Sequence, residues 1–298
     1  MPPRVARCSA ASVCVPAETE VADFWRNPPW QGGRTPFRMG LQRVPSSAWL
    51  ADPIDEVMRE RKVRLMAERG REVADQEADT EDVQRQVVAA MASELFERPA
   101  FARVRPRDPE RLAETALWVP DDLCLLVPSP DGYRLVAASL CSPSYWRLQE
   151  KLGRTIQGVH AAVPGLNEAV GDGVARFFDR LPVGTVFQRR NWNIHRGNHL
   201  FHPQNEDWSA PLAVADCESL YMRSETQTLR KYAKGPLLFT IRVRCFPLAQ
   251  IADYPSAAAD LLTAIGRLSP EERQASVFAH HGEALARYLR AFGSAVET

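Results

Sequence analysis

Several features of well-known protein classes are missing from this chain of 298 residues. It has no run of about 18 consecutive apolar residues, so the sequence offers no membrane-spanning helix. Its 37 Lys and Arg balance its 37 Asp and Glu. An extended nucleic-acid-binding surface normally shows as a surplus of basic residues, so this balance disfavours a nucleic-acid partner. With 45% hydrophobic residues, the chain is typical of a globular protein.

The motifs of common nucleotide-binding and hydrolytic enzymes are also missing. The chain has no GxGxxG, no P-loop, no GxSxG and no HExxH, so these mechanisms lack the residues that anchor them. The six cysteines form no CxxC pair and no CxxCH haem-attachment motif. Irregular spacing of this kind is typical of reduced thiols, and we therefore expect a cytoplasmic protein.

The N-terminal part of the chain has an irregular composition. Residues 1–20 contain a run of small residues, but its apolar stretch is too short and broken for a signal peptide. Residues 25–49 are rich in Pro, Gly and Arg without a period, which is typical of an extended arm. We predict a partly disordered extension over residues 1–35 and one compact domain over residues 36–298.

Apolar residues at helical spacing predict two helices before residue 100. The pair Asp52-Pro53 provides an N-cap and a proline at the first helical position, and residues 54–65 continue with a helical period over about five turns. A second apolar stripe runs over residues 83–95, and its helix should stop before Pro99.

The middle of the chain has patterns typical of strands. Residues 123–127 and 133–138 flank a Pro-Ser-Pro-Asp-Gly turn, which predicts a hairpin. Residues 186–194 and 237–245 alternate between two faces and predict longer strands.

Three further helices complete the pattern. One is short and ends at Gly153, one covers residues 166–178, and a C-terminal helix follows a capping box at residues 269–272. Helices on both sides of a run of strands indicate an α+β fold, in which N- and C-terminal helices flank a central antiparallel sheet.

Three of the six histidines, His195, His199 and His202, lie close together in the sequence. Imidazoles four residues apart on one helix can share a zinc ion. Gly197 and Asn198 favour a turn instead, and we identify neither a carboxylate nor a cysteine after them at zinc spacing. A loop at the end of a strand is the main interpretation, and a zinc hydrolase at these histidines is the alternative.

The remaining histidines have other settings. His280 and His281 fall on the C-terminal helix near its predicted exposed face, and we expect both at the surface. His160 lies between two predicted helices, where an irregular backbone could present its imidazole to a cavity. From spacing alone, a hydrogen-bonded loop histidine is the simpler interpretation.

Short motifs occur in a distinctive order along the chain. They are Phe37-Arg-Met-Gly-Leu41, Asp122-Leu-Cys-Leu-Leu126, Ser139-Leu-Cys-Ser-Pro-Ser144, His160 with Val163-Pro164, Arg190-Asn-Trp-Asn193, Arg223-Ser-Glu-Thr-Gln-Thr-Leu229 and Leu238-Phe-Thr-Ile-Arg242. In this order they resemble the haem-dependent oxidative N-demethylase family, over residues 36–265.

The resemblance implies a PAS-like antiparallel sheet that binds haem b non-covalently. Members of this family use O₂ to oxidise a methyl group on a secondary amine to formaldehyde. Their electrons come from NAD(P)H through a flavin and iron-sulfur partner. The implied partners are a small amine, O₂ and a reductase protein, without nucleic acid or membrane. For the assembly of the chain, the alternatives are a homodimer and a hetero-complex.

The resemblance also implies roles for particular residues. By position, His160 is the axial ligand of the haem iron, with His195 as the substitute, because a neutral imidazole is an ordinary ligand of non-covalent haem. Arg223 and Glu225 alternate along a strand and would face one side. The carboxylate could hold an ammonium substrate, and the arginine could orient it or bind a haem propionate. A structural Arg–Glu pair is the alternative.

Other motif residues would surround the haem. Trp192, Phe239 and Ile241 have the bulk to wall an apolar pocket, although ordinary core packing predicts the same pattern. Arg190 and Arg242 are candidates for binding the haem propionates.

The chain departs from the family pattern at two positions. Ala162 stands where many members have a proline after the histidine, and Thr226 stands where many have an arginine after the motif glutamate. The second change could alter the charge of the pocket. A haem enzyme that oxidises a different nitrogen-containing substrate, and a haem-PAS gas or redox sensor, are therefore the alternatives to N-demethylation.

Overall fold

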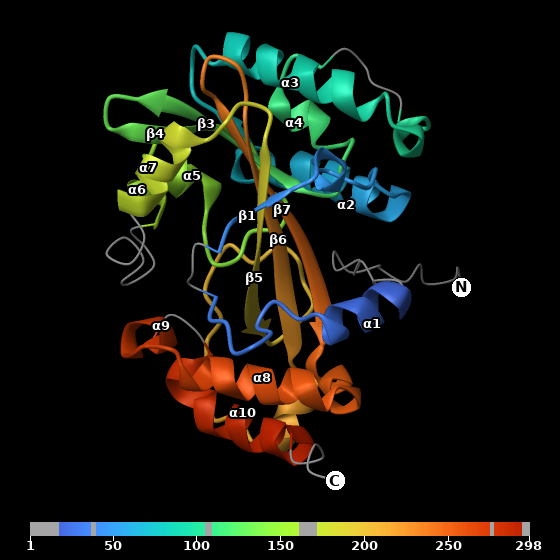
Figure 1. Cartoon of the computed structure of the whole chain (residues 1–298), viewed down its shortest axis with the longest axis vertical. Helices are drawn as coiled ribbons and strands as arrows, with labels where there is room; N and C mark the ends of the chain where they lie inside the picture. Colours follow the sequence, from blue (N-terminus) through green and yellow to red (C-terminus); the bar gives the residue numbers. More distant parts are fainter. Residues whose placement is uncertain (1–17, 37–39, 105–108, 161–171, 275–276, 294–298) are drawn as a thin grey trace, which may run out of the picture.

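A seven-stranded antiparallel sheet runs through the middle of the molecule, in the order β1-β5-β6-β7-β3-β4-β2 (Figure 1). The computed structural model describes residues 18–36, 40–104, 109–160, 172–274 and 277–293. The strands are β1 (Gln42–Val44), β2 (Ala74–Gln76), β3 (Asp122–Ser129), β4 (Gly132–Ser139), β5 (Val186–His195), β6 (Tyr221–Lys231) and β7 (Leu237–Pro247). The predicted α+β class with an antiparallel sheet is confirmed.

Helices cover both ends of the long strands β5, β6 and β7. They are α1 (Glu18–Arg26), α2 (Glu56–Arg69), α3 (Glu81–Leu95), α4 (Leu112–Thr115), α5 (Leu148–Lys151), α6 (Ile156–His160), α7 (Asp172–Arg180), α8 (Pro255–Gly266), α9 (Pro270–Gln274) and α10 (Phe278–Gly293). In Figure 1, α3 and α4 lie at one end of these strands, and α8, α9 and α10 lie at the other. None of the described helices has the length and apolar character needed to cross a membrane.

Most of the predicted elements form, with shifted boundaries. Helix α2 begins at Glu56 rather than at Pro53 because the carboxylate of Asp55 accepts a hydrogen bond from the backbone N–H of Met58 at 2.7 Å and caps it. The expected cap residue, Asp52, pairs with Arg242 instead. The capping box is confirmed, because Ser269 and Glu272 bond to each other's backbone N–H groups at the start of α9.

Tryptophans fasten the N-terminal segment to the C-terminal helices. Trp25 and Trp30 have no exposed surface and belong to the same core cluster as residues of α8 and α10. Trp30 Nε1 donates to the carbonyl of Ala257 at 2.8 Å, and Trp25 Nε1 donates to Gln250 Oε1 at 3.0 Å. The predicted boundary at residue 35 therefore does not separate residues 18–35 from the core. Residues 1–17, the rest of the predicted extension, lie outside the described residues.

Gly33 provides a test of this docking. Both Gly32 and Gly33 have a positive φ, but a Cβ at Gly33 would lie 2.6 Å from Thr263 Cγ2 of α8, whereas a Cβ at Gly32 would contact nothing within 4 Å. Gly33→Ala should therefore cost about 1–3 kcal/mol of stability beyond the cost of Gly32→Ala. Urea unfolding of the two variants measures the difference, and equal stabilities would contradict a close approach of this segment to α8.

Candidate functional site

The long central strands bring polar side chains together on one face of the sheet. In the register of β5 and β6, Asn193 is paired with Arg223 and Asn191 with Glu225. Because side chains alternate along a strand, Arg223 and Glu225 share a face with His195 at the end of β5. Val243 and Cys245 of β7 lie on the same face, opposite Glu225 and Arg223.

Arg223 is almost fully buried and holds two loops. Its Nη1 donates to the carbonyl of Leu200 at 3.1 Å, and its Nη2 donates to the carbonyls of Ser142 and Pro143 at 2.6 and 3.2 Å. Ser142 and Pro143 precede α5, whereas Leu200 lies in the connection between β5 and β6. The guanidinium therefore fastens both segments over the sheet, and its two terminal nitrogens are occupied by backbone.

Glu225 lies beside this arginine and is 9% exposed. Its Oε1 is 3.6 Å from Arg223 Nε, and its Oε2 accepts a hydrogen bond from Gln227 Nε2 at 2.8 Å. Gln227 in turn accepts a hydrogen bond from Arg189 Nε at 2.6 Å. The carboxylate is thus oriented by a chain of donors, and such a group can bind a cation or accept a proton.

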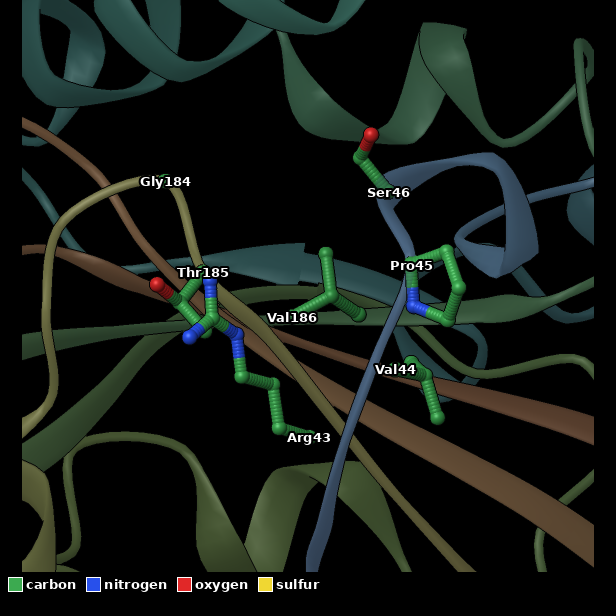
Figure 2. A pocket seen from close by; sticks show the side chains of 7 residues that line it. All are labelled: Arg43, Val44, Pro45, Ser46, Gly184, Thr185 and Val186. Carbon is green, nitrogen blue, oxygen red and sulfur yellow. The ribbon is translucent and has the colours of Figure 1, made fainter.

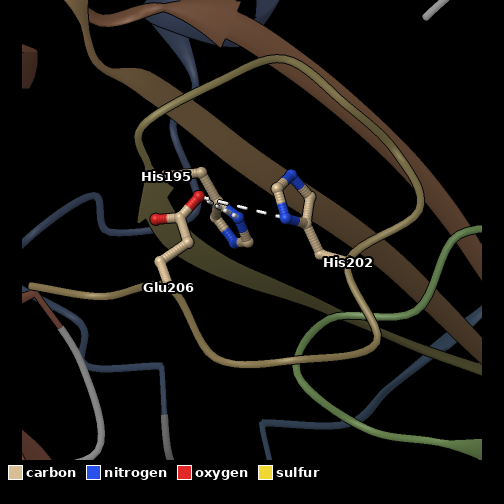
Figure 3. A group of neighbouring side chains, drawn as sticks. All are labelled: His195, His202 and Glu206. Carbon is tan, nitrogen blue, oxygen red and sulfur yellow. Dashed lines mark ion pairs between the residues drawn. The ribbon is translucent and has the colours of Figure 1, made fainter.

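A second group of titratable side chains lies next to Arg223. His195, His202 and Glu206 approach one another at the end of β5 (Figure 3). Glu206 Oε1 is 3.7 Å from His195 Nδ1 and 3.9 Å from His202 Nδ1. The carboxylate is held from the other side by the backbone N–H of Arg196, which lies 3.1 and 3.0 Å from its two oxygens.

Tyr145 completes this group from the loop before α5. Its ring stacks on the imidazole of His195, with 4.7 Å between the centroids, and its hydroxyl is 3.2 Å from His195 Nδ1. The backbone of Tyr145 has a φ of 60°, a left-handed conformation that costs free energy in a residue other than glycine. The hydrogen bond from its N–H to the carbonyl of His202, at 2.6 Å, holds this conformation.

Burial keeps both imidazoles of the group neutral at physiological pH. It lowers the pKa of His195 well below the ordinary value, and the charge of Arg223 lowers it further. The same two causes lower the pKa of His202 to about 4. Burial raises the pKa of Glu206. Neutral imidazoles have a free lone pair, which is the form that binds metal ions.

The residues predicted to wall an apolar pocket do not lie together. Trp192 is paired with Ser224 and belongs to the core cluster of α1, α8 and α10. Phe239 and Ile241 lie on the opposite face, where Phe239 packs against the cluster that contains Phe178 of α7. The expectation that all three line one pocket is therefore wrong, because strand register sends Trp192 to the other side of the sheet.

The two predicted propionate-binding arginines have protein partners. Arg242 forms ion pairs with Asp121 and Asp52, each with a closest N–O distance of 3.3 Å. Arg190 donates to the carbonyl of Asn27 and lies over the ring of Phe24. Neither arginine lies on the face of Glu225, because both are in register with Thr226 on the alternate positions of β6.

The remaining histidines also have definite positions. His160 is the last residue of α6, but its side chain and residues 161–171 lie outside the described residues. His199 is exposed and does not belong to the group of His195 and His202. The surface position predicted for His281 is wrong. This side chain is buried and its Nε2 bonds to the carbonyl of Trp208 at 2.8 Å, whereas His280 is exposed.

Two surface cavities lie away from these polar groups. One, of about 500 Å³, is lined by residues 43–46, at the end of β1 and just after it, and by residues 184–186, at the start of β5 (Figure 2). The other, of about 540 Å³, is lined by residues around β2, including Asp75 and Glu77. Neither lining contains a residue of the group around His195 or the Arg223–Glu225 pair, so we place the candidate chemistry on the sheet face rather than in these cavities.

Sequence reasoning missed Glu206 and Tyr145. Glu206 follows His202 by four residues, so a search for a carboxylate after the histidines would have found it. Tyr145 lies 50 residues before His195, and no local pattern connects the two. Its contact depends on the pairing of Ser144 with His202 in an isolated bridge.

Comparisons with known proteins identify the family. No curated protein matches the sequence. A family model described as haem-dependent oxidative N-demethylase, alpha subunit-like, matches residues 99–285, which is more than half of the chain. The match includes the strands β3 to β7 and both polar groups on the sheet face. The chain therefore belongs to the haem-dependent oxidative N-demethylase alpha subunit-like family.

Proposed function

We propose that this chain is the haem-binding oxidative component that removes a methyl group from a secondary or N-methyl amine. One N-methyl group, one O₂, two electrons and two protons give formaldehyde, the demethylated amine and water. The electrons come from NAD(P)H through a flavin and iron-sulfur partner. The antiparallel sheet that binds the haem has a PAS-like fold. The family match supports haem-dependent oxidation, and the description of the family as an alpha subunit supports an assembly with other components.

The single observation that supports an amine as the substrate is the environment of Glu225. This carboxylate is largely buried and oriented, and the apolar side chains Val243 and Ile241 lie on the same face of β7. A secondary amine is a cation at neutral pH, and a carboxylate in an apolar setting is its natural binding partner. Glu225 would hold the ammonium and keep its methyl group at a fixed position.

The described residues fit a haem group in two respects. His195 Nε2 is buried and has no hydrogen-bond partner among the described residues, so the substitute ligand has a ring nitrogen that no described group engages. The face that contains Glu225 also has an apolar cluster with Ile241, Val243 and Leu200. We propose His160 as the axial ligand and His195 as the substitute. When bound, haem would supply the redox chemistry with O₂.

The residues of the chain itself would bind, orient and shield the substrate. Arg223 is a positioning residue in this account. It fixes the two loops over the sheet and keeps its Nε 3.6 Å from Glu225. These loops would exclude water from the reacting amine, which strengthens the attraction between ammonium and carboxylate.

Turnover assays test the proposal. The haem-loaded full chain, with a chemical reductant, O₂ and a panel of secondary and N-methyl amines, should release one formaldehyde for each demethylated amine. Omission of O₂ should abolish the release. Reversible O₂ binding without formaldehyde from any amine in the panel would instead favour the gas-sensor function, and consumption of an amine without formaldehyde would favour a different nitrogen oxidation.

A further inference from the structure

We infer that His195, His202 and Glu206 form a binding site for one divalent transition-metal ion of the zinc type, distinct from the haem iron. The three side chains have exposed fractions of 1%, 15% and 11%, so the group is largely shielded from water. This site goes beyond the proposed oxidation and does not depend on it.

The spacing of the donor atoms matches a small ion. Zinc bound by nitrogen and oxygen at about 2.0–2.1 Å in a tetrahedron separates its ligand atoms by roughly 3.3–3.4 Å. The Oε1 atom of Glu206 lies 3.7 Å from His195 Nδ1 and 3.9 Å from His202 Nδ1. All three donor atoms lie within 4.8 Å of one another, so small movements of the side chains would bring them onto one ion.

The protein alone leaves these imidazoles incompletely bonded. The Nε2 atoms of His195 and His202 are both buried and have no hydrogen-bond partner among the described residues. A buried nitrogen without a partner costs free energy, and native structures contain few of them. Because no described group fixes the tautomer at Nε2, each ring can carry its proton there and leave the lone pair of Nδ1, the nitrogen nearest Glu206, to the ion.

Tyr145 supplies an independent observation at the same point. Its backbone is strained, and its hydroxyl lies 3.2 Å from His195 Nδ1, the same nitrogen that lies near Glu206. Strain of this kind accumulates at binding sites, where the surrounding contacts maintain it. The hydroxyl is positioned to be a fourth ligand or to bond a water molecule in that place, while three protein ligands and one open position are typical of catalytic zinc.

The donor atoms of the site suit a divalent cation. Glu206 provides the negative charge, and the N–H of Arg196 fixes the orientation of its carboxylate. Two imidazoles and a carboxylate form a donor set that first-row divalent metals such as Zn²⁺ prefer over Mg²⁺ or Ca²⁺.

The ion would also stabilise the two loops that lie over the Arg223–Glu225 pair. The backbone N–H of His202 donates to the carbonyl of Pro143, and the carbonyls of Pro143 and Leu200 both accept hydrogen bonds from Arg223. Metal binding at His195 and His202 would therefore join the end of β5 to both loops that Arg223 holds. It also occupies His195, which leaves His160 as the ligand of the haem iron.

Metal titration tests the site. Tag-free full chain, loaded with haem and freed of loosely bound metal by chelation, should bind one equivalent of Zn²⁺ in calorimetry. Co²⁺ should bind with the same stoichiometry of one equivalent. His202→Gln and Glu206→Gln should each weaken Zn²⁺ binding. The loss should be at least about 10- to 100-fold, the usual effect of removing a residue that only supports a metal ligand. His199→Gln, a change at an exposed neighbour outside the group, should bind Zn²⁺ as the wild type does.

The haem spectrum separates this site from the iron. His202→Gln should lose Zn²⁺ and keep the Soret band of the wild type. Zn²⁺ binding that survives both ligand variants, or a wild-type chain that takes up no equivalent of Zn²⁺, would overturn the inference. A Soret band lost in His202→Gln would also overturn it, because the group would then belong to the haem. Zinc is measured by calorimetry and haem by its Soret band. A chain that binds no haem would therefore contradict the proposed function without affecting the zinc result.

Discussion

Replacing Arg223 by methionine should lower the free energy of unfolding by about 3–5 kcal/mol, the usual cost of removing one partner from a buried charged pair. Methionine fills much of the volume of the arginine stem but donates no hydrogen bonds. The carbonyls of Leu200, Ser142 and Pro143 would lose their partner, and Glu225 would lose its nearest cation. The two loops over the sheet should therefore open more readily.

Arg190→Met is the matched control for this variant. Arg190 lies on the neighbouring strand β5, is exposed, and bonds one backbone carbonyl. Its loss should cost less than about 1 kcal/mol, as for most exposed polar contacts. Urea midpoints of the two variants measure the difference. An Arg223→Met protein as stable as Arg190→Met would contradict the role of Arg223 in holding the loops.

The substitution Glu225→Gln should lower kcat/KM for amine demethylation by about 100-fold while the fold and the Soret band persist. Glutamine keeps the shape of the side chain and removes the charge that we propose binds the ammonium. A hydrogen bond to a charged group contributes about 1.5–3 kcal/mol, which corresponds to roughly 10- to 150-fold in binding. The loss should appear in KM more than in kcat, because the proposed contact between carboxylate and ammonium exists before reaction as well as during it.

Glu94→Gln is the control for the loss of a carboxylate. Glu94 lies on α3 and pairs with Arg230 at the far end of β6 from Glu225 and with Arg98. This variant should keep the kcat/KM of the wild type. An unchanged KM in Glu225→Gln, or an equal loss in both variants, would contradict the assignment of Glu225 to the amine.

The sequence was sufficient for elements whose periodicity is strong. The stripe at residues 83–95 corresponds to α3, and the alternating segments at 186–194 and 237–245 correspond to β5 and β7 with small extensions. The helical spacing of Phe278, His281 and Leu285 indicates one face of α10, and all three side chains are buried. Local patterns of this kind are visible because each residue's neighbours along the chain determine them.

The site depended on information that no local pattern contains. Alternation predicts which residues of one strand share a face, but only the register between strands decides that Trp192 and Phe239 lie on opposite sides. The loop that places Tyr145 beside His195 joins segments 50 residues apart through a left-handed residue. The docking of α1 likewise depends on Trp25 and Trp30, whose hydrogen-bond acceptors lie more than 200 residues away in the sequence.

The absorption spectrum of the haem-reconstituted chain tests the central claim, that this protein is a haem enzyme with His160 as the iron ligand. The account predicts a Soret band at one haem per chain in the wild type. It also predicts a lost or shifted band in His160→Ala and an unchanged band in His195→Ala. A wild type without a Soret band, or an unchanged spectrum in the protein that carries both His160→Ala and His195→Ala, would contradict it.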